Sequence, residues 1–163
     1  MKLVGHFDYY GLDELFEQFE RFENELPAMI YEIIGDVGVK AVRYAQNCLG
    51  VSVSGLGTGR LKESIMYRID AIDDGLKLVV FANREYGIYV EYGTGTAGDP
   101  SVAHVHESTW VYYDKERGFI TAHAQPPRPF MYPAFVYTVD LLRGGEMQRL
   151  LSERICELLN NGE

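Results

Sequence analysis

The chain has 163 residues, 47% of them hydrophobic and 13% aromatic, and a formal net charge of −9 at pH 7. This length and composition can bury one substantial core, so we expect a single folded domain and exclude a disordered chain. The acidic balance argues against a protein that grips nucleic-acid phosphates over a large face. No apolar run approaches the roughly 18 residues of a membrane span, and the N-terminal sequence lacks signal-peptide features, so we expect a cytosolic protein.

The first third of the chain has apolar residues at helical spacing. An amphipathic helix is predicted from residue 12 to residue 26, with acidic residues on its other face. Asn24 and Pro27 then indicate a stop and a restart, because proline is tolerated only near the start of a helix. The second helix is expected to continue to Cys48. Cys48 and Cys156 match no metal or redox spacing and occupy apolar helical positions, so we expect two reduced core thiols.

The middle of the chain changes to a strand pattern after the Gly- and Ser-rich loop at residues 50–59. Two β-prone runs, 64–71 and 76–82, flank a turn at Asp73-Asp74-Gly75 and predict a hairpin. Residues 85–92 have the spacing of a short helix, which Gly93 ends by adopting a left-handed conformation. A glycine-rich loop follows. Strands at 109–113 and 119–122 around Glu116-Arg117-Gly118 predict a second hairpin.

The stretch AHAQPPRPFMYPAF, residues 122–135, sets four prolines among three aromatic residues. Each proline fixes its own φ and disfavours helix in the residue before it, so residues 124–129 should form a rigid, extended strut. A helix is expected to follow, and Gly144-Gly145 should separate it from a last amphipathic helix. The order of elements predicts an α+β fold, with helical parts at about 11–49 and 130–160 packed against a small antiparallel sheet of two hairpins within about 60–123.

The sequence offers few groups with catalytic potential. His104, His106, Glu107 and His123 are candidate zinc ligands of a metal-dependent hydrolase, but their spacing matches no known metal motif, and solvated loop residues are the simpler interpretation. The glycine-rich loops lack the Gly-Lys-Ser/Thr ending of a phosphate loop, and no nucleophile elbow is present. We therefore expect no catalytic residue, no metal and no cofactor. Tyr9, Tyr10, Tyr112 and Tyr113 are candidates for an interface, where aromatic side chains give contact area at low entropic cost.

Four segments occur in an order that resembles a known family. They are GTGRLKESI (57–65), YGIYVEYGTG (86–95), WVYYD (110–114) and AQPPRPFMYPAF (124–135). Together they are similar to the small tail-component proteins of long-tailed bacteriophages, called tail-completion, neck or head–tail joining proteins. The resemblance spans roughly residues 11–160. The loops at 50–57 and 97–108 are longer than a minimal member needs, and Tyr132 stands where members often have a basic residue.

The resemblance implies a structural protein of virion assembly that completes the tail end and joins the tail to the head connector as part of a ring. The implied partners are copies of the chain, a tail tube or tail terminator protein, and a head connector or stopper protein, with no specific nucleic-acid binding and no membrane. The implied location is the neck or tail of the virion, and the host cytoplasm during assembly. A minor head component or an assembly chaperone is the alternative. The residues that the resemblance marks as interface candidates are Thr58, Gly59, Tyr89, Glu91, Tyr92, Gly93, Thr94, Gln125, Pro129, Phe130 and Pro133.

Two of these candidates carry specific expectations. Glu91 falls near the C-terminus of the predicted short helix, where the helix dipole disfavours a carboxylate. It should therefore have a basic partner, and Arg60 or Arg128 is favoured over Lys62. Phe130 either belongs to a docking surface that the strut presents or packs in the core of its own subunit. The sequence leaves both open, because a rigid strut suits a ring subunit with two patches held at a fixed angle, yet it also suits a simple corner.

Overall fold

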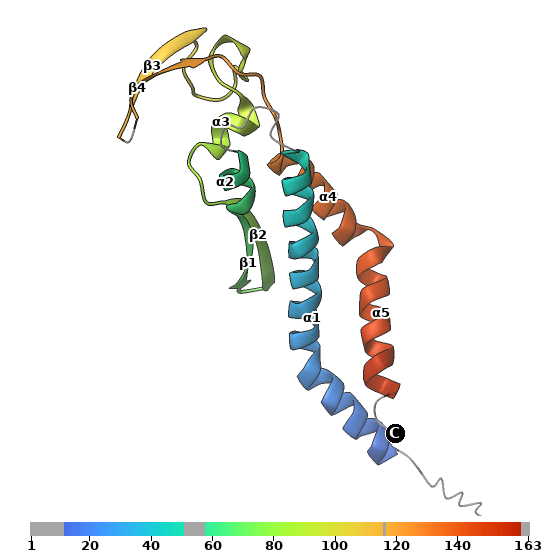
Figure 1. Ribbon diagram of the computed structural model, residues 1–163. Helices are drawn as coiled ribbons and strands as arrows, with labels where there is room; N and C mark the ends of the chain where they lie inside the picture. Colours follow the sequence, from blue (N-terminus) through green and yellow to red (C-terminus); the bar gives the residue numbers. More distant parts are fainter. Residues whose placement is uncertain (1–11, 51–57, 116, 161–163) are drawn as a thin grey trace, which may run out of the picture.

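The computed structural model describes residues 12–50, 58–115 and 117–160, which form an elongated α+β arrangement (Figure 1). The α+β class is as expected from the sequence. The helices are α1 (Leu12–Cys48), α2 (Thr58–Glu63), α3 (Gly87–Tyr92), α4 (Met131–Arg143) and α5 (Gly145–Asn160), with a single 3-10 turn at Gly95–Ala97. The strands are β1 (Ile65–Ile72), β2 (Gly75–Ala82), β3 (Thr109–Asp114) and β4 (Gly118–His123). Most of the loop expected at residues 50–59 lies outside the described residues.

Helix α1 corrects the expected break near residue 24, because it is continuous and contains Pro27. A proline inside a helix removes one backbone hydrogen bond and crowds the preceding turn, which kinks the helix without necessarily ending it. Figure 1 shows α1 bending in its N-terminal part. Buried residues from Met29 to Ala45 recur at helical spacing, and this packing keeps the C-terminal part of the helix in place despite the proline.

Both predicted hairpins are confirmed. In the first, Ile65 pairs with Ala82 and Ile72 with Gly75; in the second, Thr109 pairs with His123. They do not join into one sheet, however, because each forms a separate two-stranded sheet. The β1–β2 hairpin packs against α1, whereas the β3–β4 hairpin projects from the end of the molecule (Figure 1).

The core lies where α1, α2, β1 and the start of α4 meet. Its fully buried members are Ala45, Leu49, Leu61, Ile65, Phe130 and Ala134. Further along α1, a Cβ at Gly38 would stand 2.5 Å from the ring of Tyr67, so the absence of a side chain lets β1 approach the helix. Tyr44 of α1 stacks on Tyr137 of α4 with ring centroids 4.3 Å apart.

The two cysteines are free, as expected, but their location differs from the expectation. Cys48 and Cys156 are both exposed and not part of the core. Each occupies an apolar-looking position on its helix, but the neighbouring elements cover other parts of these helices. The helical spacing therefore identified an apolar stripe that is wider than the buried face.

Candidate functional site

The carboxylate of Glu91 lies where two of the family-like segments, residues 86–95 and 124–135, meet. Glu91 is only 6% exposed, and its side chain accepts three backbone hydrogen bonds. One carboxylate oxygen, Oε2, accepts from the amides of Phe130 at 2.7 Å and Met131 at 2.8 Å. The other, Oε1, accepts from the amide of Tyr132 at 2.9 Å. These amides belong to the N-cap residue and the first turn of α4, so Glu91 caps a helix whose N-cap lies 39 residues later.

The expectation that Glu91 has a basic partner is therefore wrong. The guanidinium of Arg128 donates instead to the carbonyl of Leu49 at 3.3 Å. Glu91 does lie near the C-terminus of α3, where a carboxylate is disfavoured, but the same group lies at the N-terminus of the longer helix α4, where negative charge is favoured. Backbone amides with no partner inside the helix thus stabilise the negative charge of Glu91, in place of the side-chain cation that was expected.

The strut is bound to α3 and to the residues that directly follow it. The amide of Thr94 donates to the carbonyl of Gln125 at 2.8 Å, and the amide of Gln125 returns a bond to Thr94 at 3.1 Å. The amide of Arg128 donates to the carbonyl of Val90 at 2.8 Å. Together with the three bonds to Glu91, these contacts fix the direction in which α4 leaves the strut. We call this arrangement of α3, the strut and the first turn of α4 the latch.

Gly93 allows the latch to close, because the strut runs directly over it. The predicted positive φ is confirmed at 75°, and ψ is −173°, a combination that side-chain-bearing residues rarely adopt. A Cβ there would stand 2.5 Å from the carbonyl oxygen of Gln125 and 2.7 Å from the nitrogen of Pro127. Glycine is therefore required twice at this position, for the backbone conformation and for the close approach of the strut.

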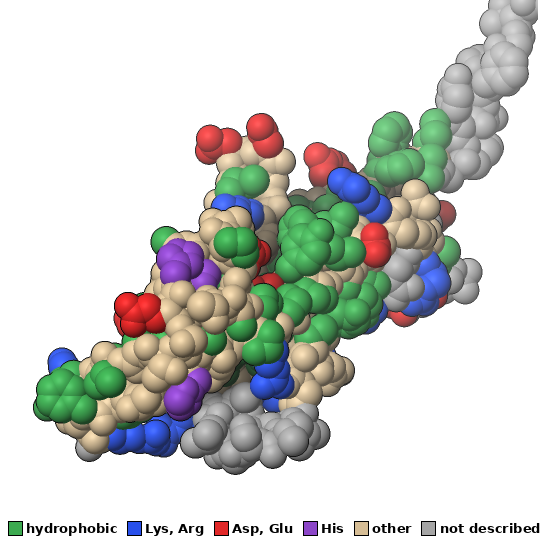
Figure 2. All heavy atoms as spheres, turned by 90° about the horizontal axis from the view of Figure 1, so that it is seen from above, with side chains coloured by type: hydrophobic (Ala, Val, Ile, Leu, Met, Phe, Trp, Pro, Cys, Tyr) green, Lys and Arg blue, Asp and Glu red, His purple; other side chains and the backbone are tan. Residues whose placement is uncertain are grey.

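An open groove of about 550 Å³ lies beside the latch, between β2, α3 and α4. The buried Glu91 and Phe130 contribute to its lining, and most of its other lining residues are apolar, with the exposed Arg84 and Glu85 among them. Hydrophobic side chains cover much of the centre of the face seen in Figure 2. We call the open groove between β2, α3 and α4 the α3–α4 groove; its wall residues include Val80, Ala82, Ile88, Tyr92, Tyr132 and Phe135.

The interface candidates divide into those that build the latch and those that face solvent. Phe130 is 1% exposed and belongs to the core, so the simpler of its two interpretations is correct. Gly93 is buried with Glu91, and Thr94 and Pro133 are half-buried. The candidates whose side chains are exposed are Tyr89, Tyr92, Gln125 and Pro129, while Gly59 is exposed in α2. Thr58 begins α2, and Tyr9 and Tyr10 lie outside the described residues.

The candidate metal ligands are not assembled into a site. Among the described residues, no group of three or more His, Cys, Asp or Glu side chains is placed to hold a metal ion. Both ring nitrogens of His104 face backbone carbonyls, Nδ1 that of Val102 at 2.6 Å and Nε2 that of Gly95 at 3.1 Å. His104 thus holds its own loop together, which corrects the expectation of a solvated side chain. His123 lies on β4 beside Thr109 instead.

Sequence reasoning identified the residues of the latch but missed what Glu91 does. One local signal was available: the N-cap position of α4 is Phe130, a residue whose side chain cannot cap a helix, and no side-chain cap is present at that position. A buried helix start without Ser, Thr, Asp or Asn needs an acceptor from elsewhere in the chain. The buried position of Glu91 could not be read from the sequence.

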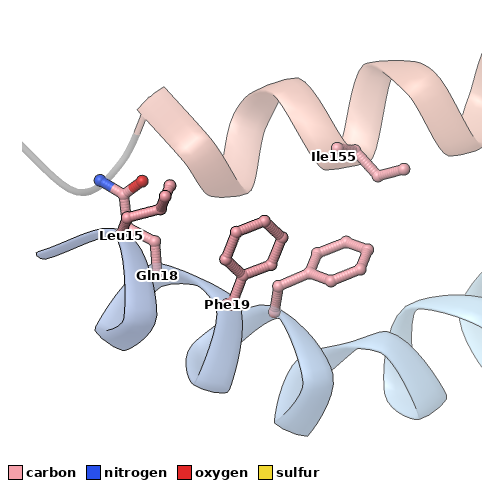
Figure 3. Close-up of a pocket in the computed structure, with 5 residues that line it drawn as sticks. Leu15, Gln18, Phe19 and Ile155 are labelled. Atoms are coloured by element: carbon pink, nitrogen blue, oxygen red, sulfur yellow. The ribbon is translucent and has the colours of Figure 1, made fainter. Parts of the chain in front are cut away.

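A second, smaller cleft of about 120 Å³ lies at the opposite end of the molecule, between α1 and α5 (Figure 3). Its lining is apolar apart from Gln18 and includes Leu15, Phe19 and Ile155. The rings and aliphatic side chains point toward one another across the two helices, which closes this end of the helical pair. It contains no polar group positioned for chemistry, so the α3–α4 groove is the better candidate for a binding site.

Comparison with known proteins identifies a family match. The model of the family described as "Bacteriophage HK97-gp10, putative tail-component" matches residues 13–93, which run from the start of α1 to the end of α3. No curated protein and no solved structure matches the chain significantly. Within the described residues, no helix is long and apolar enough to cross a membrane.

Proposed function

Because the chain belongs, through residues 13–93, to the HK97-gp10-like family of phage tail components, we propose that it completes the end of the tail and joins it to the head connector as one subunit of a ring. Its partners in this role are neighbouring copies of itself, a tail tube or tail terminator protein, and a head connector or stopper protein. It acts by binding and not by catalysis. It is assembled in the host cytoplasm and stays in the neck of the virion.

The observation that carries the proposal is the latch together with the exposed aromatic residues around it. A subunit that connects two large assemblies must present its contact surfaces at a fixed angle. The latch fixes α3 against α4 through the six hydrogen bonds described above, each of which involves at least one backbone group. Tyr89 and Tyr132 stand on this rigid frame with 50% and 68% of their surface exposed. Exposed apolar patches of this kind mark interaction sites on proteins.

The charge of the chain is compatible with a position around the DNA channel. A ring through which DNA passes must not hold the phosphates, and a net charge of −9 per subunit gives a repulsive field. A ring of identical subunits also needs two different, complementary patches on each copy. The α3–α4 groove supplies one candidate patch on a rigid frame.

The proposal is tested by removing the gene from a phage that encodes this chain and supplying variants from a plasmid. Without the chain, we expect filled heads and separate tails by electron microscopy, and infectious particles should return with the wild-type chain. Mass spectrometry of purified particles should find the chain in tails or joined particles. Joined, infectious particles that form without the chain would contradict the proposal. Finding it only in heads, or only in assembly intermediates, would favour the minor head component or the chaperone.

A variant separates docking from folding. Tyr132→Ala removes an exposed aromatic side chain of the groove wall while its backbone amide, the donor to Glu91, stays in place. We expect a nearly unchanged melting temperature and fewer joined particles. Tyr31→Ala is the matched control, because Tyr31 is a similarly exposed tyrosine on α1. Equal yields of joined particles from both variants would remove the groove from the proposed docking surface.

A further inference from the structure

The β3–β4 hairpin has one face that its own chain leaves uncovered. Cross-strand partners share a face of a hairpin, so Tyr113 and Phe119 lie on one side with Val111. Phe119 is 80% exposed, Tyr113 65% and Val111 61%. The rings of Tyr113 and Phe119 contact each other edge to face, with centroids 5.3 Å apart. We call this hairpin, Thr109–His123, the arm.

An isolated two-stranded hairpin is at best marginally stable in water, so an arm of this composition needs a cover. Among the described helices and strands, none makes more than marginal contact with β3 or β4 apart from the two strands themselves. The root of the arm is nevertheless fixed, because the amide of Ala124 donates to the carbonyl of Ser108 at 2.9 Å and Gln125 joins the latch. The arm is thus held at its root and presents an apolar face at its tip.

The same chain contains a groove of matching character. The α3–α4 groove is open, mainly apolar and large enough, at about 550 Å³, to accept aromatic side chains. Figure 1 shows the arm directed away from β2, α3 and α4 of its own chain. The arm and the groove are two different surfaces of one chain, so a contact between them can repeat from copy to copy. A repeated contact of this kind gives a ring where the rotation closes.

We propose that the arm of one copy inserts the face formed by Val111, Tyr113 and Phe119 into the α3–α4 groove of a second copy. This inference rests on the ring of the proposed function and names its two complementary surfaces. Charge favours a second copy as the occupant, because both surfaces are locally near neutral in a chain of net charge −9: the turn of the arm has the sequence Asp114-Lys115-Glu116-Arg117, and the rim of the groove includes both Arg84 and Glu85. Two acidic copies can therefore meet at these surfaces without local like-charge repulsion.

The expected area explains why such a contact is weak in a single pair. Two inserted aromatic side chains together bury about 300–500 Å², which is roughly half of the approximately 800 Å² that each partner contributes to a stable interface. One arm–groove contact should therefore form only transiently between free copies. In a closed ring each subunit makes two such contacts, and the neighbouring neck or tail proteins hold the copies together.

The test is cross-linking between two single-cysteine variants. In a background with Cys48→Ser and Cys156→Ser, which removes two exposed thiols, one variant carries Phe119→Cys in the arm and the other Ile88→Cys in the groove. Mixed and treated with a short bismaleimide, they should give a covalent dimer. The control mixture pairs Phe119→Cys with Tyr31→Cys on α1, which is also exposed. We expect about tenfold more dimer from the arm–groove mixture, because specific contact raises the effective concentration of the two thiols.

Equal dimer yields from the two mixtures would overturn the proposal. A chain that carries Phe119→Cys and Ile88→Cys together should give a ladder of multimers. A product that stays monomeric would also overturn it, because the arm would then reach the groove of its own chain.

A particle assay distinguishes this inference from the proposed function. Phe119→Ser should leave the melting temperature nearly unchanged, because the side chain is exposed, and lower the yield of joined particles about tenfold, as truncation of a central interface aromatic does. Normal joining by Phe119→Ser, together with a loss of joining when the gene is deleted, would refute the arm–groove contact and leave the proposed function intact. Normal joining without the gene would refute the proposed function itself.

Discussion

Replacing Glu91 by glutamine tests the central contact of the fold. The two side chains have nearly the same shape, but the amide has one acceptor oxygen where the carboxylate has two. If its oxygen keeps the bonds to Phe130 and Met131, its NH₂ group faces the amide of Tyr132, and two donors then oppose each other in a buried position. If the amide is rotated, its NH₂ group faces the amides of Phe130 and Met131, and two hydrogen bonds are lost instead of one. Either way, at least one hydrogen bond is lost and the others no longer involve a charged acceptor.

The magnitude follows from these bonds. A hydrogen bond to a charged group contributes about 1.5–3 kcal/mol and a neutral one about 1 kcal/mol, while removal of the buried charge recovers part of its desolvation cost. We therefore expect Glu91→Gln to lower the free energy of unfolding by about 2–4 kcal/mol. For a chain of this size, each kcal/mol lowers the melting temperature by roughly 2–4 °C, so the shift should be roughly 5–15 °C.

The assay is urea denaturation and thermal melting of the purified chain at pH 7, with Glu85→Gln as the matched control. Glu85 precedes the same short helix and is exposed, so its substitution should change the free energy of unfolding by less than about 0.5 kcal/mol. A difference between the two variants of less than about 0.5 kcal/mol would refute the reasoning, because a buried helix cap cannot be worth so little.

Three further outcomes are expected. Phe130→Ala, which empties a fully buried site, should cost about 3–5 kcal/mol in urea denaturation, and a cost below about 1 kcal/mol would contradict its place in the core. Gly93→Ala should destabilise the chain by more than about 1 kcal/mol. Gly59→Ala, at an exposed helical position with open space, should be neutral or stabilising, and equal effects of the two substitutions would show that a side chain at residue 93 meets no steric conflict with the strut. Hydrogen bonds from the Ser101 hydroxyl and amide hold the pKa of Asp99 below its ordinary value of 3.8, so its contribution to stability is present at neutral pH and is lost as the pH falls through that value toward the lowered pKa. The difference in melting temperature between wild type and Asp99→Asn should therefore shrink between pH 6 and pH 3, and a difference that grows on acidification would show that the sign is wrong.

The sequence by itself determined the features that depend on residues close together in the chain. Both hairpins follow from alternating apolar residues around glycine-containing turns, and the end of α3 at Gly93 follows from the need for a positive φ. The start of α4 after the proline strut is equally local, because proline restricts its own backbone and that of the residue before it. The order of the motifs also pointed to the phage tail-component family, which the match over residues 13–93 confirms.

Only the tertiary structure decided the features that depend on contacts between distant segments. Pro27 predicted a break, but the packing of α1 against α4 and the first hairpin, together with the tolerance of a helix for a kink, keeps the helix continuous. Local patterns identify hairpins but not their neighbours, so the separation of the two sheets and the projection of the arm were not predictable. Glu91 is the clearest case. Its charge suggested a cation nearby, but its actual partners are backbone amides 39 to 41 residues away, and every residue has such a group. A backbone donor leaves no mark in the sequence, and only the fold shows which amides are free and buried.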